Sequence, residues 1–105
     1  MITTSVLDTA RGAPAARVPV QLDIFITGHG WREVGHGITS EDGRVLDFGE
    51  PAVVGVYRIM FDIAAYTPHS FYPSIAITFE VRNPKDRYHL PLLLSPFGYS
   101  TYRAS

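Results

Sequence analysis

Cysteine is absent from the 105 residues of this chain, which excludes disulfide bonds and thiolate metal sites. Charge is scarce as well, because Asp, Glu, Lys and Arg make up 18% of the residues and the formal net charge is -1. A chain so close to neutral lacks the basic surface that attracts nucleic acid, so we expect no nucleic-acid partner. Its four histidines are scattered and have no carboxylates at ligand spacing, so we expect no metal site.

Long apolar runs are also missing. No stretch approaches the roughly 20 residues needed to cross a bilayer, and the opening residues MITTSVLD have neither the basic nor the apolar region of a secretory signal. We therefore expect a cytoplasmic protein with no membrane partner. The chain is nevertheless 46% hydrophobic, which is enough for the core of a single domain over residues 1–105 and suggests further burial between subunits.

Short strands separated by turns dominate the pattern along the chain. Glycine and proline mark the turns, most clearly at Asp42-Gly43 and Asn83-Pro84. Segment 64–72 is the one stretch suited to a turn of helix, although Pro68 interrupts it. Strands alternating with turns about every 8–12 residues predict an all-β antiparallel sandwich. The expected strands are 2–8, 18–27, 31–38, 53–63, 75–81, 87–95 and 97–103.

Two of these strands show which of their faces is buried. Apolar residues recur at every second position, which places them on one side of a strand. In 53–63 they are Tyr57, Ile59, Phe61 and Ile63. In 75–81 they are Ile75, Ile77, Phe79 and Val81.

The final seventeen residues, HLPLLLSPFGYSTYRAS, combine a Leu-rich run with groups that can do chemistry. His89 can give or take a proton near neutral pH. Arg103 carries a fixed positive charge, and Tyr102 and Ser105 carry hydroxyl groups. Because the leucines at 90–94 must be buried, we expect this end of the chain to pack into a site instead of extending into solvent.

Four segments resemble the transthyretin-like proteins, and among them the 5-hydroxyisourate hydrolases. They are TTSVLDTARGAPAARVPVQL near the start, SEDGR, FYPSIAITF, and YHLPLLLSPFGYSTYRAS at the end. The resemblance implies an eight-stranded transthyretin-like antiparallel β-sandwich with one short helix, assembled as a homotetramer, a dimer of dimers. It also implies a reaction without a cofactor. A small heterocyclic substrate, 5-hydroxyisourate, is hydrolysed at a cyclic amide to 2-oxo-4-hydroxy-4-carboxy-5-ureidoimidazoline during urate breakdown, in a channel between dimers.

The resemblance also assigns site residues. Arg44 matches an arginine that follows the Asp-Gly turn, and His89 matches a histidine that precedes the Leu-rich run. Tyr102, Arg103 and Ser105 match a terminal Tyr-Arg-Gly-Ser motif. These matches would place groups from distant parts of the chain around one substrate.

Two positions depart from the family pattern. Ala104 stands where the terminal motif has glycine, and Ser5, in TTSVLD, stands where a second histidine is expected in the first strand. The resemblance therefore implies two groups, catalytic and substrate-binding, which share two members. The catalytic group is His89, Arg44, Ser105 and Ser5, and the substrate-binding group is Arg103, Tyr102, Ser5 and Arg44.

The missing histidine bears directly on the expected chemistry. Opening a cyclic amide needs an activated water, donors for the developing oxyanion and a proton for the leaving nitrogen. A serine hydroxyl is no general base by itself at neutral pH, and losing one positioned acid–base group costs about 10²–10⁴-fold in rate. His89 remains as a base, while Arg44 and Arg103 are suited to bind and polarise an anionic, carbonyl-rich ring.

Several interpretations stay open at this point. Ser5 is a natural replacement in a protein that acts on another substrate, an engineered substitution, or itself a nucleophile activated by His89. A hydrolase of 5-hydroxyisourate ranks first among the functions. It is followed by a repurposed transthyretin-like enzyme acting on a different heterocycle in a biosynthetic pathway, and then by a non-catalytic small-molecule carrier. The charged residues Arg44 and Arg103 argue against the carrier.

Overall fold

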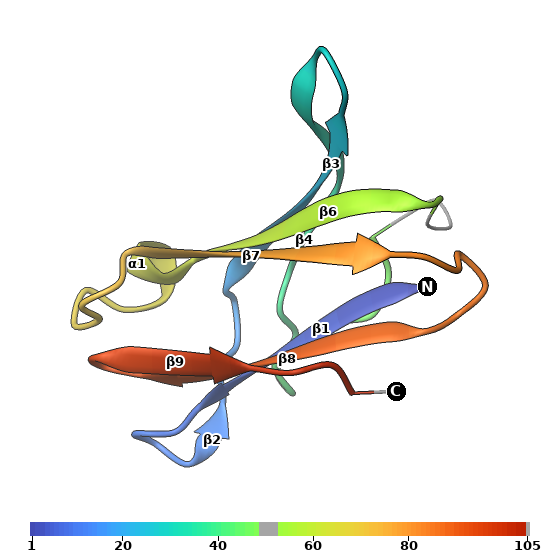
Figure 1. The fold of residues 1–105 in the computed structure, drawn as a ribbon. Helices are drawn as coiled ribbons and strands as arrows, with labels where there is room; N and C mark the ends of the chain where they lie inside the picture. Colours follow the sequence, from blue (N-terminus) through green and yellow to red (C-terminus); the bar gives the residue numbers. More distant parts are fainter. Residues whose placement is uncertain (49–52, 105) are drawn as a thin grey trace.

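The computed structural model describes residues 1–48 and 53–104, and it consists of two β-sheets that enclose one core (Figure 1). One sheet has the strand order β2-β1-β8-β9, with β5 paired to β1, and the other has the order β4-β3-β6-β7. The first sheet is built from β1 (Ile2–Asp8), β2 (Ala13–Pro14), β5 (Arg44–Val45), β8 (Tyr88–Ser95) and β9 (Gly98–Thr101). The second is built from β3 (Pro19–Ile26), β4 (Gly30–Ile38), β6 (Gly55–Asp62) and β7 (Ser74–Val81).

The predicted all-β sandwich is confirmed, with one exception to its antiparallel pattern. β1 and β8 run parallel, with Thr3 beside His89 and Ser5 beside Pro91, whereas the other described strand pairs are antiparallel. Parallel neighbours need a long crossover connection. Here the crossover is the whole second sheet, which the chain completes between Asp8 and Tyr88.

A single turn of helix, α1 (Ile63–Tyr66), follows β6 directly. The side chain of Asp62 caps its N-terminus by accepting a hydrogen bond of 3.2 Å from the backbone N–H of Ala65. The helix therefore begins one residue before the predicted segment 64–72 and ends before Pro68. In the part of the chain that the structure describes, no helix is long and apolar enough to span a membrane.

Alternating side chains of both sheets fill the core. Tyr57, Ile59, Phe61 and Ile63 are all buried, as predicted, whereas in β7 only the end residues Ile75 and Val81 are fully buried. Fully burying such a side chain stabilises the fold by about 1.5–3 kcal/mol. From the first sheet the inward residues are Ile2, Thr4 and Val6 of β1, and Tyr88, Leu90, Leu92 and Leu94 of β8. The residues between them therefore point to the outer face of the β1–β8 pair, and the candidate site lies on this outer face.

The turn before β5 fits tightly against β1. Gly43 has a φ of 76°, and its carbonyl accepts a hydrogen bond of 2.8 Å from the N–H of Val6. A Cβ at this position would lie 2.6 Å from the carbonyl oxygen of Val6. Glycine meets both demands, because it adopts positive φ without steric cost and has no Cβ. The fit sets the register that places Arg44 opposite Ser5.

Replacing this glycine should destabilise the protein more than replacing a glycine with the same backbone conformation in open space. We expect Gly43→Ala to lower the free energy of unfolding by about 2–4 kcal/mol, since left-handed backbone strain adds to a steric clash. Gly12→Ala is the matched control, because Gly12 has a φ of 65° and a Cβ added there would have no atom within 4 Å. Its cost should be about 1 kcal/mol. Equal losses for the two variants in urea denaturation would contradict the role assigned to the contact with Val6.

Candidate active site

His89 lies on the outer face of the first sheet. Its neighbours along β8, Tyr88 and Leu90, point into the core and are 5% and 6% exposed. Successive side chains of a strand point to opposite faces, so the imidazole between them points outward, where it is partly exposed. The core packing of β8 thus determines which way the imidazole faces.

Both ring nitrogens of His89 contact hydroxyl groups of β1. The Oγ1 of Thr3 lies 2.7 Å from Nδ1, and the Oγ of Ser5 lies 3.2 Å from Nε2. Thr3 and Ser5 share a face because they are two residues apart in a strand. A neutral imidazole has one donor nitrogen and one acceptor nitrogen. One hydroxyl therefore accepts a hydrogen bond from the ring while the other donates one to it.

Arg44 lies on the other side of Ser5 from His89. β5 is antiparallel to β1, and Arg44 is directly opposite Ser5 in the register. Residues directly opposite one another in an antiparallel pair project from the same face. The guanidinium Nε is 3.7 Å from a carboxylate oxygen of Asp42, and the side chain is 56% exposed. Enough of this surface is exposed for the guanidinium to meet an anionic ligand.

The surroundings of His89 disfavour its protonated form. Burial lowers the pKa of His89 below the ordinary value of 6.5, and the positive charge of Arg44 lowers this pKa further. Both effects destabilise an imidazolium cation. The ring is therefore neutral at pH 7, and one of its nitrogens is free to accept a proton from a hydroxyl group or a water molecule.

The last described residues run alongside His89. The backbones of His89 and Ala104 exchange two hydrogen bonds, of 3.3 and 2.9 Å. The hydroxyl of Thr101 donates to the carbonyl of Pro91 at 2.7 Å. The backbone near the end of the chain thus pairs with β8, whereas the side chain of Tyr102 within it remains 57% exposed. Ser105, the other predicted residue of the terminal motif, lies outside the described residues.

Arg103 does not join this group in the single chain. Its Nη2 donates to the carbonyl of Arg87 at 3.1 Å, and its guanidinium carbon lies 4.4 Å from the ring centroid of Tyr88. Tyr88 points to the core side of the sheet, opposite to His89. The predicted contact of Arg103 with a substrate therefore gains no support from one chain, and it stays a prediction. Arg103 instead holds the final segment in place, with Asp86 3.9 Å away.

The structure thus brings together Ser5, Arg44 and His89 from the predicted set and adds Thr3, which the sequence did not reveal. Its spacing from Ser5 could have pointed to it, because positions i and i+2 of a strand share a face. The missing information was the register, since only the parallel pairing sets Thr3 beside His89.

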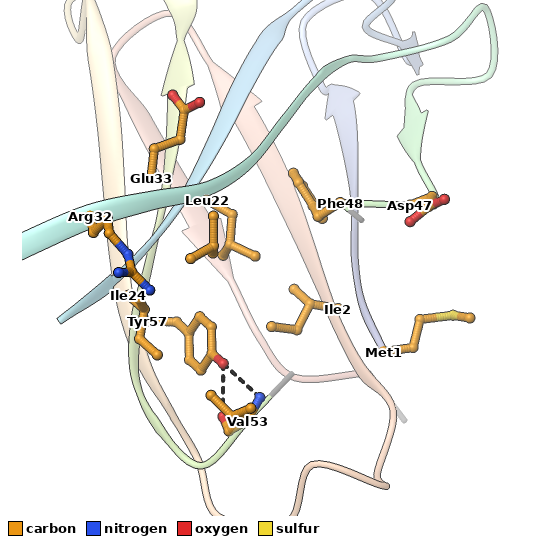
Figure 2. Close-up of a pocket in the computed structure, with 11 residues that line it drawn as sticks. Met1, Ile2, Leu22, Ile24, Arg32, Glu33, Asp47, Phe48, Val53 and Tyr57 are labelled. Carbon is orange, nitrogen blue, oxygen red and sulfur yellow. Dashed lines mark hydrogen bonds between the residues drawn. The ribbon is translucent and has the colours of Figure 1, made fainter. Parts of the chain in front are cut away.

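A separate pocket of about 440 Å³ opens at one end of the sandwich (Figure 2). Core-facing side chains such as Ile2, Leu22 and Tyr57 line it, and the hydroxyl of Tyr57 donates to the carbonyl of Val53 at 2.7 Å. It therefore lies on the opposite side of β1 from Ser5.

Nowhere in residues 1–48 and 53–104 do three His, Cys, Asp or Glu side chains gather in a way that could hold a metal ion.

Comparison with known proteins points to one family. A family profile described as "HIUase/Transthyretin family" matches residues 2–104. The chain is 44% identical over 119 residues to the uric acid degradation bifunctional protein TTL of Arabidopsis thaliana, covering 99% of this chain but 37% of that longer protein. It is 36% identical over 111 residues to the 5-hydroxyisourate hydrolase of Mus musculus, covering 99% of this chain and 94% of the mouse enzyme. A solved structure of sea bream transthyretin in complex with thyroxine superposes with a TM-score of 0.91 at 29% identity, covering 98% of this chain and 93% of that one.

Removing the charge of Arg44 should raise the pKa of His89. In the variant Arg44→Gln the imidazolium is no longer repelled, so the midpoint of the His89 titration should move toward its ordinary value. The titration is followed by NMR through the ring protons of His89. Arg82→Gln is the matched control, because Arg82 pairs with Glu80 of β7 in the other sheet and its loss should leave the titration of His89 unchanged. A midpoint that falls or stays constant in Arg44→Gln would contradict the electrostatic coupling.

Proposed function

Because the chain belongs to the HIUase/transthyretin family, we propose that it is a hydrolase that opens a cyclic amide bond of 5-hydroxyisourate during urate degradation. The expected product is 2-oxo-4-hydroxy-4-carboxy-5-ureidoimidazoline. The observation that carries this proposal is the neutral imidazole of His89, held between two hydroxyl groups beside a guanidinium. A base, a nucleophilic oxygen and a cation are the groups that opening an amide ring requires.

In the proposed reaction each residue has a distinct task. Arg44 binds the anionic ring and stabilises the negative charge that develops on the attacked carbonyl oxygen. His89 accepts a proton from the attacking water and later delivers it to the ring nitrogen as the carbon–nitrogen bond breaks. No redox step is involved, and the protein's own side chains supply the acid–base chemistry. We also propose that Tyr102 and Arg103 bind the substrate and that Ser105 is a catalytic residue.

The proposal includes a homotetramer, a dimer of dimers, because the candidate site is open in one chain. Within the described residues, β7 pairs with β6 alone and β9 with β8 alone, so each sheet ends in a free edge. Free edges are where another chain can extend a sheet. Exposed apolar side chains such as Leu7, at 39%, and Phe97, at 80%, provide further surface for burial between subunits. We place the enzyme in the cytoplasm as part of the same proposal.

A carrier of small molecules is the second candidate, favoured by the superposition on sea bream transthyretin. The polar character of the outer face argues against it. An imidazole, two hydroxyls and a guanidinium in succession suit an ionised, hydrogen-bonding ligand better than an apolar one. A third candidate, an enzyme acting on a different heterocycle, would keep the same groups and change the substrate. Measurements of turnover and binding separate these functions.

Activity is tested with freshly generated 5-hydroxyisourate, followed through the loss of its ultraviolet absorbance. We expect the protein to accelerate this loss and His89→Gln to reduce the acceleration by about 10²–10⁴-fold, since glutamine cannot act as the base. His36→Gln is the matched control, because His36 is exposed on β4 and contacts Glu33. Decay at the spontaneous rate with the intact protein would contradict the hydrolase. Tight binding without turnover would favour the carrier, and turnover of another cyclic amide would favour the repurposed enzyme.

Assembly is tested by sedimentation equilibrium. We expect a mass four times that of the 11.6 kDa chain, because a site on an open sheet face needs a second chain to exclude water. A protein that stays monomeric at all concentrations tested would contradict the proposed closure of the site between subunits.

A further inference from the structure

We propose that Ser5 is the nucleophile of this hydrolase and forms an acyl-enzyme with the substrate, with His89 as its base and Thr3 as the residue that orients His89. This proposal rests on the proposed function, and it adds a covalent step to it. Ser5, which stands where the family pattern has a histidine, would then take part in a different catalytic arrangement on the same sheet face.

The hydrogen bond between Ser5 and His89 is the first reason. The Oγ of Ser5 is 3.2 Å from Nε2, which is close to the hydrogen-bonding distance expected of a nucleophile and its base before substrate binds. Both groups are partly exposed on the outer face, so a substrate can reach the oxygen. Ser5 is therefore the hydroxyl group from which Nε2 is placed to accept a proton.

Thr3 is the third residue of the proposed catalytic group, after Ser5 and His89. Its Oγ1 is 2.7 Å from Nδ1, so the ring is held from both sides by residues of one strand. For His89 to remove the proton from Ser5, Nε2 must be unprotonated and Nδ1 must carry the hydrogen. The Thr3 oxygen then accepts the hydrogen bond from Nδ1. Orienting the base and fixing its tautomer is the task of the third group in Ser-His hydrolases. Thr3 is thus a positioning residue.

Charge around the site supports this assignment. Burial and Arg44 lower the pKa of His89, so the base is in its neutral, proton-accepting form at pH 7. Threonine carries no charge, so it orients His89 without raising the pKa of the ring as a carboxylate would. Arg44, opposite Ser5 in the register, is placed to stabilise an oxyanion next to the attacking oxygen.

Attack by Ser5 opens the ring and leaves the substrate bound to the protein as an ester. The Ser5 oxygen forms a bond to the carbonyl carbon of the cyclic amide while its proton passes to Nε2 of His89. The carbon–nitrogen bond of the ring then breaks, and the same proton goes to the departing nitrogen. That nitrogen stays attached to the rest of the substrate, so ring opening releases no fragment. A water molecule, activated by His89, then attacks the ester carbon, and its proton passes through His89 to the Ser5 oxygen as the carbon–oxygen bond of the ester breaks. The carboxylic acid released in this way loses its proton to solvent, which leaves the carboxylate and an intact Ser5.

An acyl-enzyme formed in this way has a defined mass. Because nothing leaves, the protein should gain the mass of the whole substrate. The protein is mixed with excess 5-hydroxyisourate, quenched in acid at successive times and weighed intact by mass spectrometry. Fragmentation of the tryptic peptide MITTSVLDTAR then locates the added mass. Ser5→Cys serves as a second trap, because it keeps a nucleophile at this position.

The variants give matched comparisons. Ser5→Ala should form no adduct, and its turnover should be slower than that of the intact protein by on the order of 10²-fold or more. Ser100→Ala, on an exposed position of β9 in the same sheet, should keep both adduct and rate. Thr3→Val removes the hydroxyl at constant shape and should slow formation of the adduct, whereas Thr3→Ser should restore it. Rescue by serine separates positioning of the base from simple packing.

Each result bears on the proposal in a defined way. An adduct on Ser5 that forms and decays during turnover supports it. An adduct that forms without release of product supports the covalent step and contradicts the hydrolase. Turnover with no adduct in either the intact protein or Ser5→Cys contradicts the role of Ser5 as nucleophile but is compatible with the proposed hydrolase. The same conclusion follows if Ser5→Ala is as fast as the intact protein. Absence of both turnover and adduct overturns the two together.

Discussion

The parallel pairing of β1 with β8 is the constraint on which the candidate site depends. It joins two strands that are far apart in the chain, because Thr3 pairs with His89, and Ser5, which hydrogen-bonds to the His89 ring, lies 84 positions from it. The hydrogen bonds of the sheet fix the register, and the register places two hydroxyl groups of β1 at the two ring nitrogens of one imidazole. A slip of one residue would turn Ser5 toward the core and move Val6 to the outer face. The backbone hydrogen bonds between β1 and β8 thus determine which polar groups meet at the site.

The hydrophobic core maintains this register from the other side of the sheet. Val6 and Leu92 are 2% and 0% exposed, so exchanging the two faces of either strand would expose apolar side chains and bury polar ones. The antiparallel addition of β5 then brings a guanidinium opposite Ser5, through a turn that glycine alone fits well at position 43. Packing of the core and positioning of the polar groups are therefore two consequences of the same alternation along the strands.

Local patterns in the sequence were sufficient to predict most of the strands, the buried face of β6 and the turn at Asp42-Gly43, because alternation and turn chemistry act between near neighbours. They could not show that β8 lies parallel to β1, since periodicity describes the faces of a strand and not the direction of its neighbour. β2 and β5 escaped prediction because each is two residues long. The part played by Thr3 and the position of Arg103 over Tyr88 depend on this long-range register, which a single sequence does not display.

We expect the substrate to bind on the outer face of the β1–β8 pair and not in the pocket between the sheets. A crystal structure of the protein with a slowly reacting cyclic amide analogue tests it most directly. We expect the analogue to lie against Arg44, with its amide carbon within reach of the Ser5 oxygen and next to His89. An analogue seated instead in the pocket lined by Ile2, Leu22 and Tyr57, with the outer face empty, would contradict it.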